Sequence, residues 1–170
     1  MSHKEPIVSV AGLTVAFNGN DVTHAVDLDL YPGRITALVG ESGSGKSVTA
    51  MALPRLEPAG AEVRGNALLR KDDKSTIDLL SGDAPISLIR GGLIGVVFQG
   101  PSTAFNPVFT IGSQIAEAVY SHASVKIRKT DCKERVLHQL REVGLDDAER
   151  IYGSYPHQLS GGQLQRAMIA

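Results

Sequence analysis

Hydrophobic and polar residues alternate along two short stretches near the N-terminus, residues 13–17 (LTVAF) and 26–30 (VDLDL). A period of two places the apolar side chains on one face of a β-strand and the polar ones on the other. Two later stretches, residues 35–39 (ITALV) and 93–98 (LIGVVF), are apolar throughout. Strands of a parallel sheet that helices cover on both faces have this composition. The pattern therefore predicts an antiparallel region with one wet face, followed by two buried parallel strands.

The period becomes helical after the first apolar stretch. Residues 46–56 (KSVTAMALPRL) predict a helix as far as Pro54, because proline cannot continue one. Apolar residues recur at helical spacing again at positions 111, 115 and 119, and at positions 136, 137, 140 and 143. For the second of these helices, Thr130 is the predicted N-cap and Gly144 the predicted stop.

Residues 71–85 are polar and rich in turn formers, which predicts a surface insertion. The chain as a whole is therefore predicted to be an α/β core interrupted by a helical insertion.

Composition excludes several classes of protein. The 170 residues are 42% hydrophobic, enough for one core, and carry 17 basic and 18 acidic residues for a formal net charge of −1. With charges so nearly balanced, the protein as a whole does not attract nucleic acid or an anionic membrane electrostatically. Any anion must therefore be bound by a local group of residues. Cys132 is the single cysteine and can form neither an internal disulfide nor a thiolate metal site, so a structural role is expected for it. No stretch approaches the roughly 20 apolar residues that span a bilayer.

One motif carries specific chemistry, residues 40–47 (GESGSGKS), between a predicted strand and a predicted helix. It satisfies the phosphate-loop pattern G-x-x-x-x-G-K-[ST], and the strand–loop–helix context is the one in which that pattern binds nucleotide phosphates. The residues predicted to bind the nucleotide here are Gly40, Glu41, Ser42, Gly43, Ser44, Gly45, Lys46 and Ser47. The alternative is a glycine-rich turn without a ligand.

Each residue type in this loop has a separate reason. Glycines adopt backbone angles closed to other residues and leave the approach to a phosphate open, so that successive N–H groups can point at its oxygens. The helix dipole contributes about 0.3–1 kcal/mol, whereas a hydrogen bond to a charged group contributes about 1.5–3 kcal/mol. Lys46 and the loop amides should therefore dominate affinity, while the Ser47 hydroxyl would bind Mg²⁺.

Two further motifs follow in the order that one family has. Gln99 comes directly after the apolar stretch 93–98, and residues 159–163 have the sequence LSGGQ. With the phosphate loop as Walker A, Gln99 as the Q-loop glutamine and LSGGQ as the signature, the sequence resembles the nucleotide-binding subunits of ABC transporters. The resemblance implies a P-loop NTPase core with an N-terminal antiparallel β-subdomain and an inserted α-helical subdomain, the C-terminal part of the core being missing.

The resemblance also implies roles for individual residues. Gln99 would contact Mg²⁺ and the attacking water and join the core to the helical subdomain, although by itself it could be an ordinary polar residue at a strand end. Phe17 would stack on adenine, the alternative being a core residue of its strand. Ser160, Gly161, Gly162 and Gln163 would contact the γ-phosphate of ATP held by another subunit's Walker A. The alternative for this stretch is a serine-capped helix start without a ligand, and Tyr155 and His157 just before it are expected to be packing or capping groups.

Within the family, three stretches look like the ATPases of bacterial importers for dipeptides, oligopeptides, glutathione or nickel: residues 40–53, 98–119 and 155–170. Gly100 departs from the family pattern, which has an acid before the proline. The implied partners are a second ATPase subunit arranged head to tail, two transmembrane permeases and, indirectly, an extracytoplasmic substrate-binding protein, but no nucleic acid. The implied location is peripheral, on the cytoplasmic face of the inner membrane. The alternative is a non-transport ABC-class ATPase or an inactive nucleotide-binding remnant.

The expected organisation is a partial ABC ATPase domain over residues 1–170. Residues 1–98 approximately would form the β-subdomain and Walker A core, 99–160 approximately the Q-loop and helical subdomain, and 159–170 the signature and the start of its helix. Family members continue into an apolar strand that ends in an aspartate for Mg²⁺ and a glutamate as general base, so we expect the coding sequence to continue this way beyond codon 170. The general base is absent from this chain, which should bind ATP weakly and hydrolyse it barely, and residues 35–39 should lack neighbouring strands.

Overall fold

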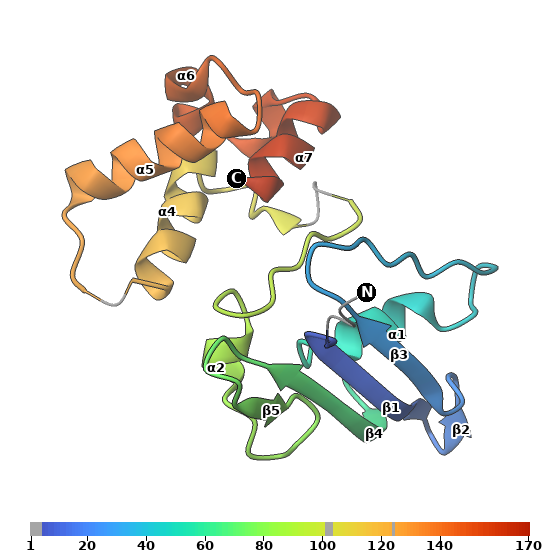
Figure 1. The fold of residues 1–170 in the computed structure, drawn as a ribbon. Coiled ribbons are helices and arrows are strands. Elements are labelled where there is room, and N and C mark those ends of the chain that lie inside the picture. The colour runs from blue at the N-terminus through green and yellow to red at the C-terminus, as the bar shows by residue number, and fades with distance from the viewer. Residues whose placement is uncertain (1–4, 101–103, 124) are drawn as a thin grey trace. The chain divides into compact units, whose positions relative to one another are not determined.

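The computed structural model describes residues 5–100, 104–123 and 125–170. The chain divides into two compact units, Met1–Ile94 and Gly95–Ala170. Each unit has its own hydrophobic core. The first contains the strands and two short helices, and the second contains the longer helices (Figure 1).

The first unit is built on an antiparallel sheet. Its strands are β1 (Val8–Phe17), β2 (Asn20–Asp21), β3 (Val26–Leu30), β4 (Ala61–Arg70) and β5 (Thr76–Asp78). Strand β1 is central, with β4 on one side and both β2 and β3 on the other, while β5 extends the sheet beyond β4 (Figure 1). The predicted antiparallel region is therefore confirmed.

The alternating pattern decides which face of this sheet is buried. In β1, Leu13 and Val15 have no exposed side-chain surface, and in β3, Asp27 and Asp29 face solvent. Both aspartates are used at that surface, because Asp29 accepts a hydrogen bond from Ser9 at 2.7 Å and Asp27 accepts one from the Gly12 amide at 2.7 Å. The period of two thus correctly predicted the orientation of these strands.

The prediction of a surface insertion over residues 71–85 is wrong in part. The segment begins with a tight turn but then forms β5, whose Ile77 pairs with Leu69 of β4. Leu79 follows, completely buried, with its amide donating to the Ala67 carbonyl at 2.7 Å. Because the surrounding residues are polar, nothing in the sequence indicated that Leu79 belongs to the core.

Two helices accompany the sheet, α1 (Lys46–Ala52) and α2 (Ile86–Ile89). Helix α1 ends before Pro54 as predicted, and its Ala52, with the following Leu53, is buried in the core of the first unit. Ile89 at the end of α2 is buried in the same core.

The two apolar stretches predicted as buried parallel strands are not strands in this structure. Residues 35–39 have no regular secondary structure, and Ile35 and Val39 are 99% and 91% exposed. Residues 93–98 form only an isolated bridge at Ile94, and Phe98 is 43% exposed. A parallel strand needs hydrogen-bond partners at its edges, and the described part of the chain supplies none for residues 35–39. The expectation that this stretch would lack neighbours is confirmed.

The second unit is helical. Its elements are α4 (Ile111–Ser121), α5 (Lys129–Glu142), α6 (Ala148–Gly153), the 3₁₀ turn η1 (Pro156–Gln158) and α7 (Gly161–Ile169). The predicted faces of α4 and α5 are confirmed, since Ile111 and Ile115 meet Val136 and Leu140 in one core. Cys132 is buried in that core as a free thiol, in agreement with a structural role. Within the described residues, no helix has the length and apolar character needed to cross a bilayer.

Of the two predicted ends of α5, the first is wrong and the second is confirmed. Thr130 is not the N-cap of α5, because Arg128 holds that position and Thr130 lies inside the first turn. The Arg128 guanidinium donates two hydrogen bonds of 2.9 Å to Asp131, which fixes the start of the helix two residues earlier than predicted. Gly144 does end the helix, with a φ of 74° that other residues adopt only at a cost.

Candidate nucleotide-binding site

The loop of residues 40–47 depends on glycine at two positions for its backbone shape. Gly43 and Gly45 have φ values of 83° and 86°, in the left-handed region where a side chain is strained. Gly45 is also the N-cap of α1 and faces the first unit's sheet region so closely that a Cβ there would lie 2.6 Å from the Thr23 methyl carbon. At Gly40 a Cβ would lie 2.8 Å from Ser44 Oγ, so a larger residue there would have to displace the Ser44 hydroxyl. The loop therefore forms a defined turn before α1.

The loop leaves a run of backbone donors unused. Ser44 donates to the Glu41 carbonyl at 3.2 Å and closes the turn. Among the described residues, the amides of Gly43, Gly45, Lys46 and Ser47 donate to no protein acceptor. N–H groups at successive positions of a left-handed turn can converge on an anion. The chain therefore has the donor set that phosphate oxygens require.

The Lys46 side chain folds back onto the loop that precedes it. It is partly buried, and Nζ donates to the Glu41 carbonyl and, at 3.2 Å, to Ser44 Oγ. The ammonium is thus held at the loop by neutral acceptors, which a phosphate would outcompete because hydrogen bonds between charged partners are roughly twice as strong. Ser47, Glu41 and Ser42 are exposed.

Sequence reasoning missed Thr23, which supports this loop. Its side chain is buried and lies under Gly45, and its hydroxyl accepts a 2.8 Å hydrogen bond from the Val15 amide of β1. The antiparallel sheet thereby holds the end of the phosphate loop in place. No motif contains Thr23, and only its spatial contact with Gly45 indicates its importance.

Phe17 is the last residue of β1 and is partly buried against the core of the first unit. Its neighbour Ala16 is almost fully buried, so Phe17 points to the other face of the strand. This position satisfies the expectation of a strand residue and leaves part of the ring accessible.

Gln99 is exposed at a bend in the second unit. The buried strand expected before it is not formed, as described above, so the polar side chain stands on an irregular segment. Within the described residues, no group of three or more His, Cys, Asp or Glu side chains is placed to hold a metal ion. In the first unit, the Ser47 hydroxyl and oxygens of the nucleotide itself would be the ligands open to Mg²⁺, which is often held by few protein groups together with substrate phosphates.

The signature residues form the start of α7. Ser160 is the N-cap, its Oγ accepting from the Gln163 amide at 3.3 Å while Gln163 Oε1 accepts from the Ser160 amide at 3.1 Å. This reciprocal pair is a capping box. Gly161 and Gly162 are exposed, a Cβ on either would meet nothing within 4 Å, and their amides donate to no acceptor in the described part of the chain. The signature is thus both a capped helix start and an open pair of backbone donors.

Tyr155 and His157 lie just before the signature. Their rings stack with centroids 5.7 Å apart, and the Tyr155 amide donates to Gln158 Oε1 at 2.8 Å. The capping expectation is confirmed for Tyr155, which is the N-cap of η1, whereas both side chains are exposed and pack on each other.

Curated relatives match almost the whole chain. A glutathione import ATP-binding protein of Salmonella paratyphi A is 45% identical over 96% of this chain and 27% of its own length. A putative peptide import ATP-binding protein of Brucella ovis is 42% identical over 98% of this chain and 51% of its own length. The chain therefore spans about a quarter to a half of these relatives.

Solved structures and a family model agree with these matches. A dimeric ATP-binding cassette in a post-hydrolysis state, bound to ADP and Pi, superposes with a TM-score of 0.76 at 26% identity, covering 95% of this chain and 67% of that one. The α/β fold with a phosphate loop is the fold of such cassettes. The model of the ABC transporter family matches residues 23–170. This chain is a member of the ABC transporter family.

Proposed function

We propose that this chain is the ATP-binding, energy-coupling part of a bacterial ABC importer for peptides or a related small solute. The observation that carries the proposal is the phosphate loop. Beside the Lys46 ammonium, left-handed Gly43 and Gly45 leave neighbouring amides without a protein acceptor among the residues that the structure describes. A set of fixed donors and one cation in a small space is selective for a polyphosphate.

We propose a separate role for each of the residues at the site. The loop amides and Lys46 bind the phosphates, Ser47 provides a hydroxyl toward Mg²⁺, and Phe17 offers a ring face to the adenine. ATP supplies the free energy for transport when bound. Gln99 orients water and metal, and it lies five residues after the end of the first unit at Ile94.

The exposed amides of Gly161 and Gly162 supply the second half of a site in trans. They lie at the start of a helix, where an anion is favoured, and they have open space in front of them. The dimeric cassettes among the structural neighbours support an arrangement in which two such chains face each other head to tail. Each ATP would then lie between one chain's residues 40–47 and the other chain's residues 160–163.

The names of the relatives support import of a peptide or glutathione. We accordingly propose two permease subunits as direct partners, an extracytoplasmic binding protein as an indirect one, and a peripheral position on the cytoplasmic face of the inner membrane. The residues described supply no positioned general base, which is typically worth about 10²–10⁴-fold in rate. We therefore expect this chain by itself to bind ATP weakly and to hydrolyse it very slowly.

Calorimetric titration with ATP tests the phosphate loop directly. In the full-length protein, Lys46→Ala should abolish measurable binding, because it removes the only side-chain cation of the loop without straining the glycine turns. Lys71→Ala is the matched control, since its ammonium pairs with Asp73 at 3.8 Å in the β4–β5 turn and should not affect affinity. Unchanged ATP affinity in Lys46→Ala would contradict the assignment.

Co-expression of the full-length gene product with candidate permeases tests the transport role. A transport ATPase should co-purify with two permeases and show solute-stimulated ATP hydrolysis. ATP binding without any permease association would instead support the alternative, a non-transport ATPase of the same class.

A further inference from the structure

Helix α1 starts in the phosphate loop, and its other end is closed in an unusual way. The Leu56 amide donates to the Met51 carbonyl at 2.8 Å, and the Arg55 amide donates to the Ala52 carbonyl at 3.1 Å. This double closure normally places glycine in the left-handed position. Here that position is held by Arg55, with a φ of 60°, a conformation that costs a residue with a side chain of order 1–3 kcal/mol. Contacts of the arginine must offset that cost.

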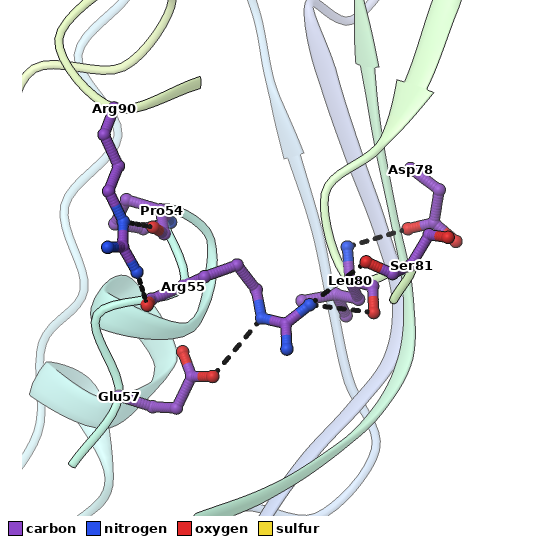
Figure 2. A network of polar contacts seen from close by, with 7 residues as sticks. All are labelled: Pro54, Arg55, Glu57, Asp78, Leu80, Ser81 and Arg90. Atoms are coloured by element: carbon purple, nitrogen blue, oxygen red, sulfur yellow. Dashed lines mark hydrogen bonds and ion pairs between the residues drawn. The ribbon is translucent and has the colours of Figure 1, made fainter. Parts of the chain in front are cut away.

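The Arg55 side chain connects the end of α1 to the segment after β5. Its Nη1 donates to the carbonyls of Leu80 and Ser81, both at 3.2 Å, and its Nε donates to Glu57 Oε1 at 3.3 Å (Figure 2). The Leu80 amide in turn donates to Asp78 Oδ1 at 3.1 Å. These hydrogen bonds therefore connect the C-terminal end of α1 to the segment that follows the edge strand β5.

Arg90 makes a second connection from the same point. Its Nε donates to the Pro54 carbonyl at 2.9 Å and its Nη2 donates to the Arg55 carbonyl (Figure 2). A single guanidinium thus binds two successive carbonyls beyond the last turn of α1. Because the guanidinium is a planar fork with fixed donor directions, this pair of contacts fixes an orientation as well as a distance.

The turn after Arg90 fixes Ile94 relative to the end of α2. The Gly91 amide donates to the Ile94 carbonyl at 2.9 Å, and the Ile94 amide donates to the Ile89 carbonyl at 2.8 Å. The turn is also closely packed, since a Cβ on Gly92 would lie 2.4 Å from the Leu88 carbonyl oxygen. Ile94 is the last residue of the first unit, and Gln99 follows it in the next segment of chain.

We propose that Arg90 is a positioning residue that makes the segment leading to Gln99 follow the movements of α1. The inference rests on the proposed function, because it requires that a nucleotide acts on α1 through residues 40–47. A phosphate that displaces the Lys46 ammonium from the Glu41 carbonyl changes the contacts at one end of α1. A helix of this length moves as one body, so Arg90 transmits the change from its other end to Ile94. The state of the phosphate loop then biases the conformation of the segment that carries Gln99.

Amide hydrogen exchange on the protein with and without ATP and Mg²⁺ tests this coupling. In the wild type, ATP should change exchange at residues 94–99 as well as at residues 40–47. Arg90→Met keeps the length and packing of the side chain but has no donor. It should reduce the response at residues 94–99 by about fivefold or more, the lower range of coupling between linked sites, while ATP still binds and protects residues 40–47. Because coupling is reciprocal, the ATP dissociation constant should shift by no more than the same factor. An equal response at 94–99 in wild type and Arg90→Met would overturn the proposal.

Two further variants separate coupling from stability. Arg64→Met removes another arginine of the first unit, whose guanidinium pairs with Asp21 at the surface, and it should leave the response intact. Arg90→Lys keeps the charge but can reach only one carbonyl at a time, so it should give an intermediate response even if Arg90→Met loses protection throughout β1 and β4. A full response in Arg90→Lys together with a globally unfolded Arg90→Met would assign Arg90 a purely structural role and overturn the proposal.

The outcomes also distinguish the two proposals. If calorimetry finds no ATP binding to the full-length wild-type protein, the proposed function fails. If ATP binds and protects residues 40–47 but exchange at residues 94–99 does not change, only the coupling by Arg90 fails.

Discussion

Two glycine-containing loops in this chain lead into helices, and they are built on opposite principles. Before α1, Gly43 and Gly45 take left-handed backbone angles and Gly45 lies in tight contact with Thr23. Before α7, Ser160 has ordinary extended angles and caps the helix with its side chain, while Gly161 and Gly162 are the first residues of the helix itself. The first loop needs glycine to fold. The second does not, so its glycines are available to keep the approach to the helix open.

Glycine therefore has different roles in the two loops. It permits the backbone conformation before α1, and it leaves the backbone amides accessible at the start of α7. Glycine inside a helix is less favourable than alanine by about 0.5–1 kcal/mol. The second unit accepts that cost at Gly161 and Gly162, although no neighbouring atom would obstruct a larger residue. A ligand that approaches these amides closely is a reason for glycine there, whereas at Gly45 the fold alone is sufficient reason.

Gly45→Ala should have the largest effect on stability. The substitution forces a Cβ to within 2.6 Å of the Thr23 methyl carbon at a φ of 86°, and we expect the free energy of unfolding of the first unit to fall by about 2–3 kcal/mol. Urea titration followed by amide exchange measures both units in one sample. The second unit is the internal control, and a loss spread equally over both units would contradict the local explanation.

Ser160→Ala should have an intermediate effect, confined to the second unit. It removes the acceptor for the Gln163 amide at the start of α7, which should cost about 1 kcal/mol. Ser160→Asp restores an acceptor and should recover that stability. It also places a carboxylate beside the two free amides, so ATP bound by the partner's phosphate loop should be held less tightly in Ser160→Asp than in the wild type. Equal stability of the alanine and aspartate variants would contradict the capping role.

Gly162→Ala should have the smallest effect and the opposite sign. It adds a methyl group where nothing lies within 4 Å and should stabilise the second unit by about 0.5 kcal/mol, near the lower end of the alanine advantage because the first turn is only partly constrained. If the signature amides contact ATP in trans, this more stable variant should nevertheless dimerise less on ATP, as measured by analytical ultracentrifugation. Loss of stability in Gly162→Ala would contradict the claim that the loop before α7 does not need glycine to fold.

The elements that could be predicted from sequence are those whose pattern reflects local geometry. The alternation in residues 26–30, the helical faces that bury Ile111 and Leu140, and the end of α5 at Gly144 all follow from backbone period and glycine conformation. The turn at residues 40–47 could also be predicted, because left-handed backbone angles such as those of Gly43 and Gly45 favour glycine. The support that Thr23 gives the loop could not be found, because it depends on a contact between residues distant in sequence.

The amino-acid sequence was sufficient to identify the segments that match motifs of the ABC transporter family and the apolar faces of the strands and helices, because these properties depend on residues within a few positions of one another. Tertiary structure alone decided whether an apolar segment becomes a strand. Residues 35–39 have the composition of a buried strand, yet Ile35 is 99% exposed, because a strand forms only beside partners that accept and donate its backbone hydrogen bonds. Tertiary structure likewise decided that Arg55 and Arg90 meet at the end of α1, since their alignment depends on where the chain returns after β5 and α2.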